Sequence, residues 1–264
     1  MGGSTMVSGI PFLTSVDAKL AMAEEHLGRL QEDFARIGEQ KGNAIFFQHN
    51  ADSTELTLWI RFDPPPGVRW GGIIGDHANN LRSALDHMVY AIAVGESGQE
   101  PPPEEHRLQF PIADLEKNWK NVKYHIDSLS DPVRALIQGE QPYKRRKGRE
   151  LVSLSVLGAL TNRDKHRTIL VGASLPQGAK FDFIGPTQPV GLQKFVRWKE
   201  PVIDQAPLVT FVFDRPNPNV DVDVKFSFGV GLNIDGVWCP AMPLLRTIRD
   251  EVARLVDLLR PCVK

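Results

Sequence analysis

Polar side chains with chemical potential form a stripe along Gly75–Tyr90, GDHANNLRSALDHMVY. At about 100° per residue, a helix over this stretch places on one face Asp76, Asn80, Ser83 and His87, with Arg82 to the side. Carboxylate, amide and imidazole groups in a row are suited to a catalytic or ligand-binding site. The same pattern also fits a polar network between two helices, or the solvated face of one amphipathic helix.

A second polar cluster follows a helix expected over residues 151–160. That helix is apolar nearly all round, so we expect it to lie deep in the protein and its polar end to emerge near the core. Because buried polar groups need partners, we expect the two clusters to meet. The residues of this expected joint site are Asp76, Asn80, His87, Asn162 and His166, with Asp164, Lys165 and Arg167 beside them.

A basic loop lies between these clusters, beside Tyr143. Five of the six residues from 144 to 149 are cations, and Arg163, Lys165 and Arg167 add to the positive charge of the chain nearby. The pattern predicts a phosphate or RNA contact through Lys144, Arg145, Arg146 and Lys147, with a solvated loop as the alternative. Cations also favour helix C-termini, which is a second explanation for Lys165, His166 and Arg167.

Metal binding is a further alternative for these residues. Asp76, His87, Asp164 and His166 provide oxygen and nitrogen donors that suit zinc, manganese or iron. Their spacing matches no metal signature such as H-E-x-x-H, and there is no glycine-rich phosphate loop or G-x-S-x-G motif. We therefore predict no metal site and no cofactor.

The elements that must position these residues are helical up to residue 167. Apolar residues repeat at gaps of four and three from Val16 to Ile37, which predicts a long helix whose seam packs inside the chain or on a second copy of it. A β-hairpin is expected over residues 43–63. The central helix runs from about 68 to 94, and shorter helices are expected at 115–126 and after Ser130.

From residue 168 the apolar pattern changes to a period of two. Strands are expected at 168–174, 180–185 and 208–213, with a long strand at 220–232 and a hairpin turn at 214–219. An amphipathic helix at 244–259 closes the chain. We predict one α+β domain over residues 1–264, with a mainly helical part at 10–167, antiparallel strands at 168–240 and a closing helix at 241–264.

Composition limits the classes of partner. The 31 basic and 32 acidic side chains give a net charge of −1, which argues against coating of nucleic acid or an anionic membrane by the whole surface. The two cysteines form no disulfide framework, and the sequence has no secretory signal and no apolar run of about 18 residues. We expect a cytoplasmic protein with no membrane contact and a local anion site at most.

Four separated motifs carry a resemblance to bacterial proteins of unknown function. GDHANNLRSALDH, FPI at 110–112, QPY at 141–143 and NRDKHR at 162–167 resemble, in this order, the pattern G-D-x-x-H-N-L-R-S-A-L-D-H, F-P-I, Q-P-Y and N-x-D-K-H-R. The histidine of the pattern falls on Asn79 here, with His77 two positions earlier. This resemblance covers residues 75–167 and implies no activity.

The segment from Arg82 to His87 is also similar to the R-x(4–6)-H motif of the HEPN superfamily of helical ribonucleases and toxins. The resemblance implies metal-independent cleavage of RNA, usually in a cleft between two protomers. His87 would move the proton and Arg82 would stabilise charge on the phosphate. The expected function is thus a HEPN-like RNA-acting protein, with a homodimer as an option. The alternative is a non-catalytic binding or scaffold protein in which the same residues form a structural network.

Overall fold

The computed structural model describes residues 7–36, 44–145, 152–174, 180–184, 192–197, 201–225 and 229–264. These residues divide into two compact units. The helical unit contains the described residues of 1–28, 74–167 and 243–264, and the strand unit contains those of 29–73 and 168–242. Every predicted site residue that the structure describes belongs to the helical unit.

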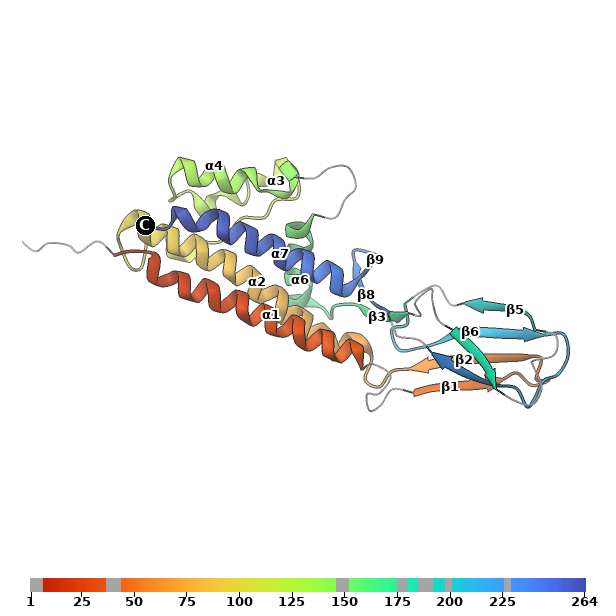
Figure 1. Ribbon diagram of the computed structural model, residues 1–264. Coiled ribbons are helices and arrows are strands. Elements are labelled where there is room, and N and C mark those ends of the chain that lie inside the picture. The colour runs from red at the N-terminus through yellow and green to blue at the C-terminus, as the bar shows by residue number, and fades with distance from the viewer. Residues whose placement is uncertain are drawn as a thin grey trace, which may run out of the picture. The chain divides into compact units, whose positions relative to one another are not determined.

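Three long helices run side by side in the helical unit (Figure 1). They are α1 (Leu13–Ala35), α2 (Pro66–Ser97) and α7 (Ala241–Leu259). Helix α1 is antiparallel to the other two, because its residue numbers fall along each contact as those of α2 and α7 rise. The contacts that fix these directions are Ala23 with His77, Ser15 with His87, Glu24 with Arg249, and Asp17 with Arg260.

Apolar stripes explain the packing of α1 and α2. The predicted core face of α2 is fully buried, at 0% exposure for Ile74, Leu81, Leu85, Met88 and Ile92. The predicted seam of α1 is covered within a single chain, with no more than 9% exposure for Val16, Ala23, Leu27, Leu30 and Phe34. Burial of such side chains stabilises the fold by roughly 1.5–3 kcal/mol each.

Proline and glycine mark the two ends of α2. Pro66 occupies the first helical position, where its missing N–H costs no hydrogen bond. At the other end Gly98 has φ of +64°, in the left-handed region that glycine enters without strain, and its N–H donates to the Val94 carbonyl at 2.8 Å. The helix is therefore longer than the predicted 68–94.

Shorter helices complete the unit. They are η1 (Ile10–Phe12), η3 (Glu105–Arg107), α3 (Glu116–Trp119), η4 (Lys123–Ile126), α4 (Asp131–Gly139), α5 (Pro142–Arg145), α6 (Ser153–His166) and η5 (Arg260–Cys262). The prediction of one helix over 115–126 is wrong, because α3 ends at Trp119 and a separate 3₁₀ turn follows. Ser130 does stand at the N-cap of α4, but its side chain binds Glu96 and not the helix backbone.

The strand unit contains the predicted hairpin. Strands β1 (Ala44–His49) and β2 (Glu55–Arg61) pair antiparallel, and β6 (Gln205–Phe213) and β5 (Leu192–Arg197) extend the sheet in the order β1-β2-β6-β5. Leu56, Val209, Phe211, Phe213 and Val222 form a buried apolar cluster in this unit. Pairing of β2 with β6 thus joins segments about 150 residues apart in the chain.

Two smaller antiparallel groups complete the unit. Strands β3 (Val171–Ser174), β8 (Gly229–Ile234) and β9 (Val237–Pro240) form one group, and β4 (Lys180–Ile184) pairs with β7 (Asp221–Lys225) in the other. Within the predicted strand at 220–232, β7 pairs with β4 and β8 pairs with β3 and β9, while residues 226–228 lie outside the described residues. The predicted hairpin at 214–219 is wrong, since β6 and β7 do not pair in the described sheets.

The architecture confirms the predicted α+β class, with helices, antiparallel strands and a closing C-terminal helix. Among the residues that the structure describes, no helix combines the length and the apolar character that crossing a membrane requires.

Candidate functional site

The first half of the candidate site is a pair of side chains on α2 that hold the backbone of Phe110. The Arg82 guanidinium donates to the Phe110 carbonyl at 2.6 Å, and the Phe110 N–H donates to the Asp86 carboxylate at 2.8 Å. Arg82 and Asp86 also form an ion pair at 3.3 Å, one helical turn apart. Phe110 itself is fully buried. The two charged side chains thus bind both backbone groups of Phe110, as a neighbouring β-strand would.

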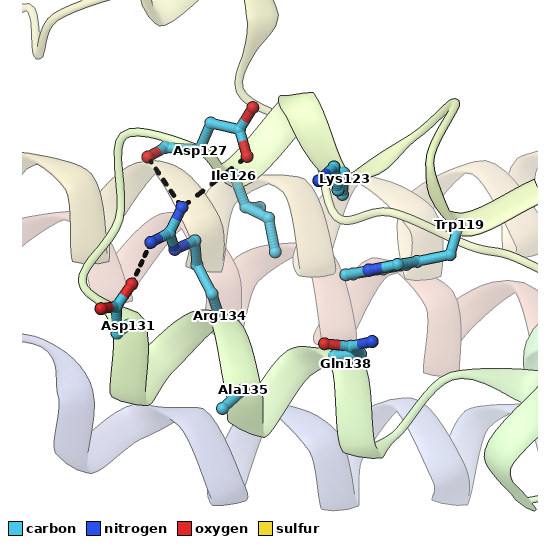
Figure 2. A pocket seen from close by; sticks show the side chains of 8 residues that line it. All are labelled: Trp119, Lys123, Ile126, Asp127, Asp131, Arg134, Ala135 and Gln138. Carbon is cyan, nitrogen blue, oxygen red and sulfur yellow. Dashed lines mark hydrogen bonds and ion pairs between the residues drawn. The ribbon is translucent and has the colours of Figure 1, made fainter. Parts of the chain in front are cut away.

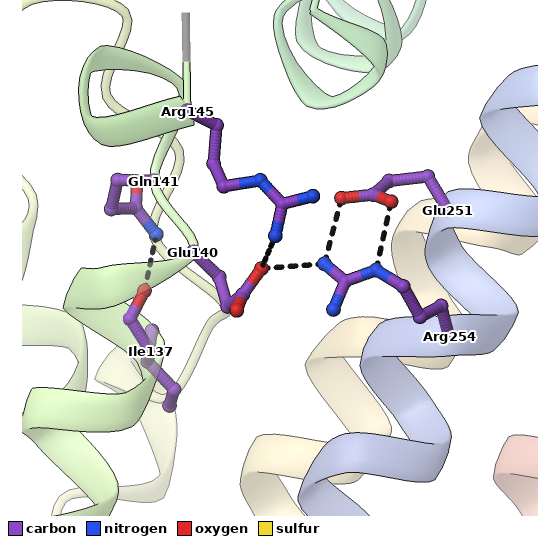
Figure 3. Close-up of polar contacts among 6 residues, drawn as sticks. All are labelled: Ile137, Glu140, Gln141, Arg145, Glu251 and Arg254. Atoms are coloured by element: carbon purple, nitrogen blue, oxygen red, sulfur yellow. Dashed lines mark hydrogen bonds and ion pairs between the residues drawn. The ribbon is translucent and has the colours of Figure 1, made fainter.

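Gln141 holds the next part of the same segment. Its amide accepts the Ala113 N–H and donates to the Pro111 carbonyl, both at 2.9 Å, and also donates to the Ile137 carbonyl at 3.1 Å (Figure 3). The Gln141 side chain is fully buried, and residues 108–113 belong to no helix or strand. Its amide therefore satisfies backbone groups that would otherwise be buried without a partner.

The two polar clusters do meet, but through Asp164 and a residue outside the expected joint site, Asn79. Asn79 of α2 donates to the Asp164 carboxylate of α6 at 2.8 Å. Gly75 makes room for this contact, because a Cβ there would stand 2.1 Å from an Asp164 oxygen. The position where the resembling pattern has a histidine is thus occupied by an amide that joins two helices.

Several predicted site residues lie at the surface of the helical unit. Asp76 on α2 is exposed, as are Asn162, Lys165 and His166 on α6. Helix α6 continues to His166, so the NRDKHR cluster forms its last turns and does not follow it. Asn80 is held locally, where it donates to the Asp76 carbonyl and accepts a hydrogen bond from Lys19 at 3.3 Å.

His87 lies beside a pocket of about 320 Å³. Its lining residues are Phe12, Ser15, Asp86, His87, Tyr90 and Leu108. The Ser15 hydroxyl donates to the Phe12 carbonyl at 2.7 Å and lies 3.1 Å from His87 Nδ1. Since the one hydroxyl proton of Ser15 is used, His87 donates to the Ser15 oxygen from Nδ1. Ser15 therefore accepts from the imidazole, the reverse of an activated nucleophile.

His77 is the buried histidine of the motif. It is fully buried between helices, with Nδ1 2.8 Å from the Ala23 carbonyl. Burial lowers the pKa of His77 below its ordinary value, although the carbonyls of Ala23 and Leu245 oppose this shift. A neutral imidazole at this position joins α1 to α2.

A second pocket, of about 270 Å³, lies between α3, η4 and α4. Figure 2 shows the Trp119 indole facing the Gln138 amide across it, with Lys123 at its side. Arg134 also lines this pocket and pairs with Asp127 and Asp131, so its charge is compensated. Lys123 and Arg134 balance the two carboxylates Asp127 and Asp131 in this lining, and Lys123 is the cation that stands apart from the Arg134 ion pairs.

The basic loop adjoins this second pocket. The Tyr143 ring lies 6.5 Å from Trp119, and the Lys144 ammonium lies 5.4 Å from the Tyr143 ring centre. Arg145 instead pairs with Glu140, which also binds Arg254 of α7 (Figure 3). Arg146 and Lys147 lie outside the described residues.

Some residues of these sites were missed by sequence reasoning. Asp86 stands four residues after Arg82, a spacing that signals an ion pair on one helix face. Ser15, Tyr90 and Trp119 appear in the sequence as ordinary members of amphipathic helices, and Gln141 as part of a short motif. Their convergence depends on contacts between distant segments.

Comparison of the chain with protein-family models, with curated proteins and with solved structures finds no significant match. Within the described residues, no group of three or more histidine, cysteine, aspartate or glutamate side chains has an arrangement that could hold a metal ion.

Proposed function

We propose that the chain is a non-catalytic RNA-binding protein whose motif residues form a structural network. The observation that carries the proposal is the surface formed by Trp119 and Tyr143 with Lys123 and Lys144, which we call the aromatic–basic surface. Trp119 and Tyr143 are half-buried. Accessible aromatic faces beside cations bind single-stranded nucleic acid, because bases stack on the rings and phosphates meet the cations.

Local charge supports RNA as the ligand. Residues 114–147 contain eight lysines and arginines but five aspartates and glutamates, within a chain of net charge −1. An anionic partner would therefore be attracted to this segment more than to the surface as a whole. The pocket beside Trp119 is open enough for one base, while neighbouring phosphates would reach Lys123 and Lys144.

The structural network explains why the motif residues need not be catalytic. Arg82, Asp86 and Gln141 together make five hydrogen bonds to the backbone of residues 110–113 and of Ile137. A guanidinium bound to both a carbonyl and a carboxylate has less capacity to stabilise a phosphate. The network thus supports a structural role for Arg82, Asp86 and Gln141.

Binding of a labelled 12-nucleotide single-stranded RNA tests the proposal. Wild-type protein should bind with an affinity that falls as salt rises, since phosphate contacts release counterions. Trp119→Ala should weaken binding about tenfold, and Trp119→Phe much less, because stacking is worth about 1–3 kcal/mol per base. Arg36→Ala, which removes an exposed cation of the strand unit, serves as the control. Equal affinity of wild-type and Trp119→Ala would overturn the proposal.

A metal-independent ribonuclease is the second candidate, favoured by the position of His87 beside a pocket. In this candidate His87 moves the proton and Arg82 stabilises the phosphate. It predicts RNA cleavage in EDTA that is lost in His87→Ala and Arg82→Ala while both variants remain folded. It also predicts a homodimer, which a mass measurement in solution would detect. Absence of cleavage by the wild-type chain would eliminate this candidate.

A further inference from the structure

The pocket beside His87, lined by Phe12, Ser15, Asp86, Tyr90 and Leu108, offers hydrogen-bond acceptors and aromatic faces. We propose that it binds a small organic cation, a primary ammonium or guanidinium group attached to a compact apolar body. The inference concerns a different pocket from the aromatic–basic surface and does not depend on RNA binding.

The hydrogen bonds that the lining residues already make determine whether a ligand should donate or accept hydrogen bonds in this pocket. Each side-chain donor of the lining already has an acceptor: the Ser15 hydroxyl donates to the Phe12 carbonyl, His87 Nδ1–H to Ser15, and the Tyr90 hydroxyl to Glu100 at 3.1 Å. What the pocket side chains retain is acceptor capacity, on the Asp86 carboxylate and, in the tautomer that has its proton on Nδ1, at Nε2 of His87. A ligand that donates hydrogen bonds fits this arrangement, and a phosphate or carboxylate does not.

The surrounding charge has the matching sign. The pKa of Tyr90 reflects this charge. It is raised mainly by burial, then by Glu100, with a further contribution from Glu105. Both carboxylates therefore act on the pocket wall. Arg82 compensates Asp86, and Arg107 pairs with Glu104, so Glu100 and Glu105 determine the negative potential.

Two rings and a leucine provide the surface for the body of the ligand. The Phe12 and Tyr90 rings meet edge to face with their centres 5.5 Å apart. An ammonium group near such rings gains a cation–π contribution, and its apolar body is buried against Leu108. A pocket of about 320 Å³ accommodates a molecule of the size of 2-phenylethylamine.

Titration calorimetry on the full chain tests this inference with three probes of the same shape. The probes are 2-phenylethylamine, which is cationic at pH 7.5, neutral 2-phenylethanol, and anionic phenylacetate. We expect the amine to bind at least tenfold more tightly than the alcohol, and phenylacetate not to bind. Failure of the amine to bind, or equal binding of phenylacetate, would overturn the assignment.

Three variants locate the site. Glu100→Gln keeps an acceptor for Tyr90 but removes the charge, and should weaken amine binding about threefold to fivefold. His87→Leu keeps bulk but removes the acceptor, and should weaken it about tenfold. Glu116→Gln removes an exposed carboxylate on α3 and should leave the affinity unchanged. Wild-type affinity in both pocket variants, with their fold verified by circular dichroism, would place the bound amine elsewhere and refute the proposal.

Discussion

Asp86 accepts the backbone N–H of Phe110 at 2.8 Å across a sequence separation of 24 residues. The contact turns a charged residue of the central helix into a partner for an extended segment that belongs to no sheet. Because the Arg82 guanidinium binds the carbonyl of the same residue, Phe110 has both its backbone groups satisfied by side chains of α2.

Removal of the Asp86 carboxylate should destabilise the helical unit. Asp86→Ala leaves the Phe110 N–H without its acceptor and Arg82 without its ion pair, so we expect a loss of about 1–3 kcal/mol in the free energy of unfolding. Urea melts monitored by circular dichroism measure it. Asp76→Ala, at an exposed position of the same helix, should change stability by no more than about 0.5 kcal/mol. Equal melts for the two variants would contradict the network.

Gln141→Glu should be more damaging, because it replaces a buried amide by a carboxylate. The carboxylate cannot donate to the Pro111 and Ile137 carbonyls and introduces a buried charge. We expect a loss of about 3 kcal/mol or more at pH 7.5. The deficit should shrink toward pH 5, since protonation removes the charge and restores one donor. Gln138→Glu, at a half-buried position, provides the comparison, and a similar loss there would argue against a special role for Gln141.

A methyl group at Gly9 should separate the N-terminal segment from α2. A Cβ at Gly9 would stand 2.0 Å from the Ala91 carbonyl oxygen, a backbone atom that cannot swing away. Gly9→Ala should therefore cost about 1–3 kcal/mol. Gly28→Ala, on exposed α1 surface with nothing within 4 Å of the new Cβ, should stabilise by up to about 1 kcal/mol. Thermal melts of the pair give opposite shifts if the close approach is real.

Stability should fall on mild acidification because of His77. Burial lowers the pKa of His77 in the folded protein, so the unfolded chain takes up the proton first as pH falls through its ordinary value near 6.5. The stabilisation is thus present above pH 6.5 and is lost below it, down to the folded pKa. His77→Gln should flatten this part of the pH profile in urea melts at pH 7.5, 6.5 and 5.5. An unchanged slope in the variant would show that other groups cause the loss.

The spacing of apolar residues predicted the helices and strands whose type depends on residues nearby in the sequence. The apolar seams of α1, α2 and α7 fixed which faces are buried, and alternation from residue 168 fixed the change to strands. The different partners of β7 and β8 were not predictable in this way, because both strands alternate in the same phase. Partner choice between distant segments leaves no local pattern.

The candidate site shows the same division. Arg82 and Asp164 stand out by residue type, so their involvement was predictable. Their partners were not, since one is a backbone carbonyl at Phe110 and the other is Asn79, which lies off the predicted polar face. Every residue has a backbone carbonyl, so the residue type at a position does not show whether a distant side chain binds its backbone.

The helical unit is assembled from three separated stretches of chain, ending with residues 243–264. Asp17 and Glu24 of α1 bind Arg260 of η5 and Arg249 of α7, which follow them by more than 220 residues of chain. On a ribosome, α1 and α2 therefore emerge long before α7 can cover them. The faces of α1 and α2 that pack on α7 stay uncovered while residues 98–240 are synthesised, which exposes the nascent chain to aggregation or chaperone capture.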